Sequence, residues 1–144
     1  MTSTKHLAYT ASIASLLTTE LNSLANNTKS SASSAVDNTS NKDLWIDLNL
    51  SIATTSSRTA GGGVAVYMVQ ALDGTNYPTV NETCDRLVAY WTLDAATTAR
   101  PELIEWNIPI PPGLVKFYIL NQMGVSFAAS GSLLEFRAHS IESA

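Results

Sequence analysis

Alternation of apolar and polar side chains between residues 44 and 52 constrains the fold more than any other feature of this sequence. Leucine or isoleucine occupies every second position from Leu44 to Ile52, whereas Asp47, Asn49 and Ser51 lie between them. Because the side chains of a strand point alternately to opposite faces, this segment has one apolar and one polar face. Such a strand is typical of an antiparallel sheet with one solvated side.

Five further segments carry strand signals and are separated by turn-forming residues. They are residues 64–69, 86–93, 103–110, 114–120 and 133–138. Residues 64–69 are apolar on both faces and are expected to form a central strand, and the alternation of the others places Trp91 and Trp106 on core faces. No strong helical pattern alternates with these segments, so a parallel α/β sheet is disfavoured. We predict an all-β fold, an antiparallel β-sandwich.

The polar N-terminal third allows two interpretations. Apolar residues at 13, 16, 17, 21 and 24 fit one face of a helix, but the intervening Thr and Asn residues are poor helix formers. We therefore favour extended structure, with residues 27–36 as a further polar strand. Together these segments raise the count to about eight strands, the number in a jelly roll. The expected organisation is a polar arm over residues 1–15 and a single sandwich domain over residues 16–144.

The charge distribution argues against several partners. The net charge is −4, and no cluster of Lys or Arg is present. Nucleic-acid binding and attachment to an anionic membrane surface both need a basic patch, so neither is expected. No apolar run reaches the roughly 18 residues of a membrane-spanning helix.

Residues with the capacity for catalysis are scattered. Cys84 is the single cysteine and is expected to be a buried, inert thiol, because His6 and His139 lie near opposite ends of the chain. Glu102 and Glu105 are close in sequence but are expected to be solvated charges. We therefore predict no catalytic residue and no enzyme activity.

No metal or cofactor site is predicted either. Asp73 and Asn76 could belong to a calcium loop, but the further carboxylates of such a loop are missing, so a plain turn is favoured. The glycine run 61–63 precedes a strand rather than a helix, and it fits a hairpin link better than a phosphate-binding loop. Trp45 lies on the polar face of its strand, and this position suggests a contact site.

In order and spacing, these elements together resemble a known group of proteins. The segments that carry the resemblance are residues 20–26, 36–38, 44–50, 62–69, 73–77, 108–113, 116–121 and 124–134. Their succession, from about residue 16 to 138, is similar to the capsid cement, or decoration, proteins of tailed bacteriophages. The resemblance implies a jelly-roll virion protein that binds non-covalently to the outer capsid surface, often as a symmetric oligomer, without an active site.

The function expected from this resemblance is stabilisation of the phage head by bridging neighbouring capsomers. The expected partners are the major capsid protein and further copies of this chain, as a homodimer or homotrimer. The protein would be made in the host cytoplasm and located on the outside of the virion. The residues predicted to contact the capsid or another subunit are Leu7, Ile13, Leu16, Leu17, Trp45 and Tyr77.

An alternative function is a glycan-binding or tail- or fibre-associated β-sandwich module. Its motivation is the sandwich fold together with three aromatic residues, Trp45, Tyr77 and Tyr90, whose rings could stack on sugars.

Overall fold

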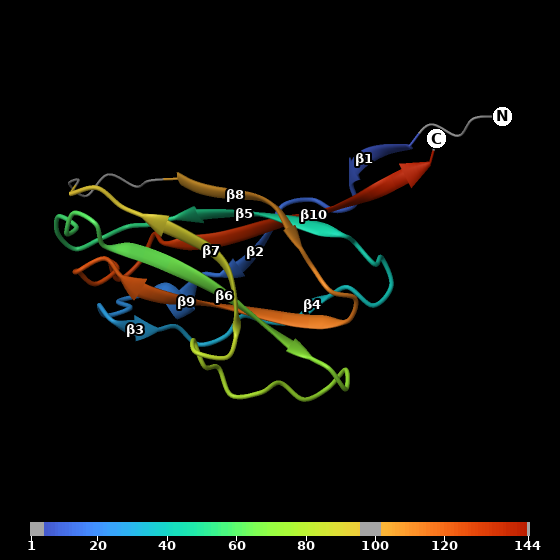
Figure 1. Cartoon of the computed structure of the whole chain (residues 1–144). Coiled ribbons are helices and arrows are strands. Elements are labelled where there is room, and N and C mark those ends of the chain that lie inside the picture. The colour runs from blue at the N-terminus through green and yellow to red at the C-terminus, as the bar shows by residue number, and fades with distance from the viewer. Residues whose placement is uncertain (1–4, 96–101, 144) are drawn as a thin grey trace.

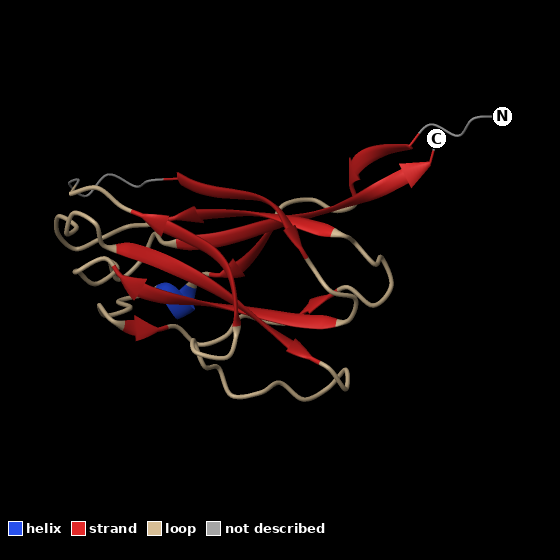
Figure 2. Cartoon of the chain, in the orientation of Figure 1, coloured by secondary structure: helices blue, strands red, loops and turns tan. Residues whose placement is uncertain are grey.

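Two antiparallel sheets face each other across an apolar core (Figures 1 and 2). A computed structural model describes residues 5–95 and 102–143. The first sheet consists of β1 (Lys5–Tyr9), β2 (Ala14–Leu17), β5 (Trp45–Ser51), β8 (Glu102–Pro109) and β10 (Leu133–Ser143). The second consists of β3 (Thr28–Lys29), β4 (Val36–Asp37), β6 (Gly63–Ala71), β7 (Arg86–Thr92) and β9 (Leu114–Gln122). In the described part of the chain, the 3-10 turn η1 (Thr19–Leu21) is the single helical element.

The strand order is that of a jelly roll. Both β1 and β2 pair with β10, and both β3 and β4 pair with β9, so each sheet has four strand positions. The order is β1/β2–β10–β5–β8 in the first sheet and β3/β4–β9–β6–β7 in the second. The predicted all-β sandwich of about eight strands is therefore confirmed. The six strands predicted between residues 44 and 138 are all present, and β6 is central as expected.

The predicted strand over residues 27–36 is wrong as a continuous element, and serine side chains explain why. Between β3 and β4, the hydroxyl oxygens of Ser30 and Ser33 accept hydrogen bonds of 3.0 Å from the backbone N–H groups of Ile119 and Phe117. Both serines are buried. Side-chain oxygens thus replace part of the backbone ladder along β9, which keeps the buried N–H groups paired although the strand is interrupted.

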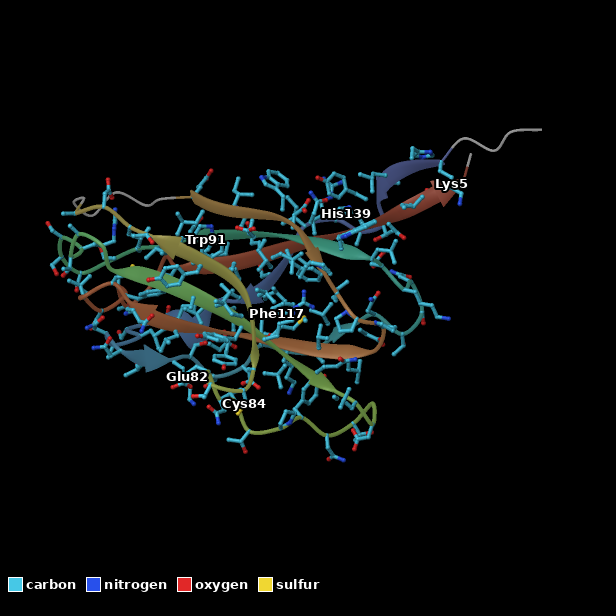
Figure 3. All side chains as sticks on the ribbon, viewed as in Figure 1. Lys5, Glu82, Cys84, Trp91, Phe117 and His139 are labelled. Atoms are coloured by element: carbon cyan, nitrogen blue, oxygen red, sulfur yellow. The ribbon has the colours of Figure 1, made fainter. Side chains whose placement is uncertain are left out.

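The core lies between the sheets and is formed by the predicted apolar faces. Ile46, Leu48 and Leu50 of β5 and Phe117 of β9 are at most 1% exposed, and Figure 3 shows Phe117 between the two sheets. Residues 16, 17, 21 and 24 also belong to this core, although they form a short strand and a turn instead of a helix.

The core prediction is wrong for Trp106, because β8 contains a β-bulge. Ile46 pairs with Ile108, but Leu48 pairs with Glu105, so two residues of β8, Trp106 and Asn107, lie opposite one residue of β5. Asn107 has a φ of +56°, a left-handed conformation that Asn adopts more readily than most residues. The extra residue reverses the alternation, and the indole of Trp106 is 58% exposed.

A similar irregularity displaces the side chain of Leu87 in β7. Val66 pairs with Ala89, but Tyr67 pairs with Leu87, so the register shifts by one residue. Leu87 is consequently 51% exposed instead of buried. Trp91 lies beyond the shift and, as predicted, packs against the core, although its ring is only partly buried.

Asp73 and Cys84 each lie in a surface turn. At residues 73–76, Oδ1 of Asp73 accepts hydrogen bonds from the backbone N–H groups of Thr75 and Asn76, which confirms the predicted turn. These hydrogen bonds, chiefly those from Asn76, lower the pKa of Asp73 to about 2.

The expectation of a buried Cys84 is wrong, because this residue lies in a turn before β7 and is exposed (Figure 3).

The chain ends form a ribbon that stands clear of the sandwich (Figure 1). Residues 5–9 of β1 pair with residues 139–143 of β10. We call these two segments the terminal ribbon. Leu7 and Ile141 lie directly opposite each other in it and are 62% and 48% exposed.

Candidate binding surface

The outer face of the first sheet gathers aromatic and charged side chains from four strands. Strand pairing creates three cross-strand rows on this face, in which β5 is central. The first row contains Glu135, Asn49 and Ile104, the second Arg137, Asp47 and the bulge of β8, and the third Tyr9, His139 and Trp45.

Asp47 connects these rows through hydrogen bonds. Its Oδ1 accepts the backbone N–H of Asn107 at 2.9 Å and lies 3.2 Å from Nε2 of His139, and its Oδ2 accepts the hydroxyl of Tyr9 at 3.2 Å. Asp47 is 8% exposed and His139 is 5% exposed. The face of β5 predicted to be solvated is therefore buried at Asp47, because the bulge of β8, β10 and β1 all contact this carboxylate.

Ring contacts fix the aromatic side chains around this network. The rings of Trp45 and His139 stack with their centroids 5.7 Å apart, and Tyr9 meets His139 edge-on at 5.6 Å. The guanidinium of Arg137 lies 3.7 Å from the centroid of the Tyr9 ring, which is a cation–π arrangement, and its Nε donates to the carbonyl of Ala11. These contacts hold Tyr9 and Arg137 in defined positions at the surface.

Two shallow hollows lie side by side on this face and share Tyr9, Asp47 and Trp106. One, of about 210 Å³, extends over Asn49, Ile104, Glu135 and Arg137. The other, of about 250 Å³, extends over Leu7 and His139 towards the terminal ribbon. We call the two hollows together the outer groove.

The outer groove combines exposed apolar rings with an unused polar atom. The rings of Tyr9 and Trp106 belong to residues that are 48% and 58% exposed, and the aliphatic Ile104 beside them is 43% exposed. Oδ1 of Asn49 is buried and has no hydrogen-bond partner among residues 5–95 and 102–143. Exposed aromatic rings beside unsatisfied polar groups are typical of a surface that receives a ligand.

The predicted contact residues lie in four different environments. Leu7 and Ile13 are each 62% exposed and border the outer groove. Trp45 is half-buried against His139. Leu16 and Leu17 are core residues, and we do not carry them into the proposals below.

Tyr77, the remaining predicted contact, is remote from this face. It precedes β7 in the chain, and Lys116 of β9 places its ammonium 4.4 Å from the centroid of the Tyr77 ring. Burial, with a smaller contribution from the charge of Asp37, raises the pKa of Tyr77. The structure therefore does not bring Tyr77 together with Trp45.

Sequence reasoning missed Tyr9, Arg137 and His139 as neighbours and assigned Trp106 to the core. The pairing of the two chain ends brings the first three residues together, and no local pattern reveals that pairing. The one available signal for Trp106 is Asn107, since Asn tolerates positive φ at a bulge.

The described residues contain neither a cluster of metal ligands nor a candidate membrane-spanning helix. Within residues 5–95 and 102–143, no group of three or more His, Cys, Asp or Glu side chains is close enough to hold a metal ion. The same residues contain no helix of the length and hydropathy that crossing a bilayer requires.

No protein-family model and no curated protein matches this sequence. Solved structures with a similar arrangement include that of infectious bursal disease virus, Gt strain, with 12% identity, a TM-score of 0.41, and coverage of 96% of this chain and 32% of that one. A β-1,3-glucan-binding CBM6 from Bacillus halodurans has 12% identity, a TM-score of 0.39, and coverage of 96% and 95%.

A glycoside hydrolase family 43 arabinoxylan arabinofuranohydrolase from Bacillus subtilis has 16% identity, a TM-score of 0.37, and coverage of 85% of this chain and 20% of that one. The chain thus spans about a fifth of this hydrolase and about a third of the matched viral chain. Similarities this low carry no argument about ligand or partner.

Proposed function

We propose that this chain is a non-catalytic capsid cement protein that attaches to the outside of a virion shell through its terminal ribbon. The observation that carries the proposal is the ribbon itself. It stands away from the sandwich, and it exposes the directly paired Leu7 and Ile141. The resemblance of residues 16–138 to phage cement proteins supports the same function.

A two-stranded ribbon is marginal in water unless another surface covers it. Covering a fully exposed Leu or Ile side chain contributes about 1.5–3 kcal/mol, so this half-exposed pair offers about 2–3 kcal/mol in all. That is a modest gain for one copy. A capsid, however, presents its sites symmetrically, and copies that also contact each other bind with a high effective concentration.

The proposed partners are accordingly the major capsid protein and further copies of this chain. Attachment by ribbon burial requires no reaction, and strain on a filled head would be shared between the capsomers that the sandwich bridges. The proposed location is the outer surface of the virion after synthesis in the host cytoplasm.

The test compares two variants of the full chain for binding to shells of the phage that encodes it. The ribbon variant carries Leu7→Asp and Ile141→Asp, which place charges on the exposed apolar pair. The control is Leu72→Asp, since Leu72 is 90% exposed in the loop after β6 and lies outside the ribbon. We expect co-sedimentation with shells to fall at least about tenfold for the ribbon variant, from the burial energy above.

The Leu72 variant should bind like the wild type, and thermal unfolding should show that both variants retain the sandwich. Undiminished binding of the ribbon variant would contradict the proposal. So would an equal loss for the Leu72 variant.

The glycan-binding alternative, in the form that relies on Trp45, Tyr77 and Tyr90, finds no support from the geometry. Trp45 belongs to the first sheet and is half-buried against His139, whereas Tyr90 belongs to β7 of the second sheet. The three rings do not form one stacking surface. A tail- or fibre-associated role would use the same fold. The location of the chain in the particle, on the head or on the tail, distinguishes that role from cement function.

A further inference from the structure

We infer that the outer groove is a binding site for a neutral saccharide, with Trp106 as the ring on which a sugar stacks. This inference goes beyond attachment to a capsid and depends on Trp106 and Asn49, which the ribbon variant above leaves unchanged. It begins from the way in which the fold exposes Trp106.

The exposure of Trp106 is built into β8 by the bulge. Regular alternation would place this indole on the core face, together with Ile108. Instead, Asn107 adopts φ +56°, its N–H is held by the buried carboxylate of Asp47, and Trp106 points outward. Bulges are frequent next to binding sites, where they redirect a side chain. A buried hydrogen-bond network that holds the bulge and keeps a large apolar ring in water has no evident benefit for stability alone.

The polar groups around Trp106 complement hydroxyl groups. In the part of the chain that the structure describes, the buried Oδ1 of Asn49 accepts no hydrogen bond. Glu135 and Ile104 lie opposite Asn49 in the neighbouring strands, and Trp106 follows Ile104 by two residues on the same outer face. The hollow is therefore lined by an apolar ring, by an acidic side chain and by Asn49, whose buried amide oxygen no described residue pairs with. A pyranose matches this pattern, because it has an apolar face and hydroxyl groups around its edge that both donate and accept.

The charge and shape of the outer groove narrow the ligand class. Glu135 and Arg137 both line the hollow over Asn49. Their opposite charges offset each other, so a polyanion gains little binding energy there. Arg137 is also engaged by the Tyr9 ring and the Ala11 carbonyl. Each hollow is below the roughly 300 Å³ of a typical small-molecule pocket. An open groove of this size suits a short neutral oligosaccharide that lies across the sheet.

The test titrates the full chain with soluble neutral oligosaccharides, namely gluco-, xylo- and manno-oligosaccharides of several linkages, and follows tryptophan fluorescence and NMR chemical shifts. We expect at least one of these probes to bind and to perturb the signals of Trp106 and Asn49. A panel in which no probe binds at millimolar concentration overturns the inference, as does tighter binding of sulfated oligosaccharides.

Three variants localise the binding. Trp106→Ala should weaken binding about tenfold, since it removes the stacking surface, and Trp106→Tyr should restore most of it. Asn49→Ala should weaken binding about threefold to tenfold through loss of one hydrogen bond. Because no described residue pairs with this amide oxygen, Asn49→Ala should leave the melting temperature unchanged or raise it, and a purely structural role would lower it.

The matched control is Tyr90→Ala, which removes an aromatic ring that is 48% exposed on the other sheet. It should leave saccharide binding unchanged, and equal loss in this control would overturn the inference.

Co-sedimentation with shells distinguishes the saccharide inference from the proposed attachment to a capsid. If Trp106→Ala reduces binding to shells while no saccharide binds, the outer groove contacts protein and the saccharide assignment is wrong.

Discussion

Replacement of Asp47 by alanine tests the network that joins the bulge, the terminal ribbon and the outer groove. The carboxylate is 8% exposed and accepts from the backbone of Asn107 and from Tyr9, with Nε2 of His139 at 3.2 Å. The alanine variant leaves the N–H of Asn107 and the ring nitrogen of His139 without their acceptor. An orphaned buried group costs about 1–3 kcal/mol, so the expected loss in the free energy of unfolding is about 3 kcal/mol.

Urea unfolding and calorimetry measure this loss. For a chain near 150 residues, 1 kcal/mol shifts the melting temperature by about 3 °C, so we expect a decrease of about 9 °C. Asp47→Asn, which keeps an acceptor but removes the charge, should fall between the wild type and the alanine variant. Glu102→Ala is the control, since Glu102 is an exposed acidic residue of the same sheet, and it should cost less than about 0.5 kcal/mol. A loss below about 1 kcal/mol for Asp47→Ala would refute the reasoning.

Three further predictions concern single residues. Phe117→Ala should lower the free energy of unfolding by about 3–5 kcal/mol in urea titrations, because the ring is fully buried between the sheets and leaves a cavity. Asn107→Gly should be nearly neutral and Asn107→Val should cost at least about 1–2 kcal/mol, since φ at this position is +56°, and comparison of their melting temperatures checks this. Burial, with the hydrogen bond to Asp85, raises the pKa of Tyr118, whereas an unfolded tyrosine ionises near pH 10. The fold therefore retains a proton that the unfolded chain loses, so stability should be full below about pH 10 and decline above it, and Tyr118→Phe should flatten that alkaline decline.

Much of the fold follows from two-residue periodicity. Ile46, Leu48 and Leu50, like Val115, Phe117 and Ile119, alternate strictly, and the structure buries all of them. These strands pair along their whole length without an interruption that displaces their apolar residues. Where one face is dry and the other wet, a slip of one residue would expose the whole apolar set, so the pattern alone specifies the register.

The predictions from sequence are wrong where side-chain hydroxyls replace backbone groups in the hydrogen-bond ladder, and where a bulge changes which face a residue lies on. Ser30 and Ser33 read as residues of an edge strand, yet their hydroxyls take the place of backbone acceptors and interrupt it. Asn107 reads as an outward residue of a regular strand, yet its positive φ reverses the order of the faces. Both effects depend on partners in distant strands, Phe117 and Ile119 in one case and Asp47 in the other.

The candidate site was predictable only in its simplest parts. Leu7 and Ile13 are exposed apolar residues in a polar segment, and a pattern of isolated apolar residues can suggest that. The outer groove is different, because it exists only once β10 pairs with β1 on one side and β5 on the other. The two chain ends are far apart in sequence, and their pairing leaves no local signature.

The most direct test of the central proposal, that this chain attaches to a virion shell through its terminal ribbon, is a cryo-EM reconstruction of the proposed particle. The account predicts sandwich-shaped density on the outside of the shell, in symmetric copies, with residues 5–9 and 139–143 against a capsid subunit or a neighbouring copy. Density that places the chain elsewhere in the particle, or that leaves the ribbon in solvent while another face makes the contact, would contradict it.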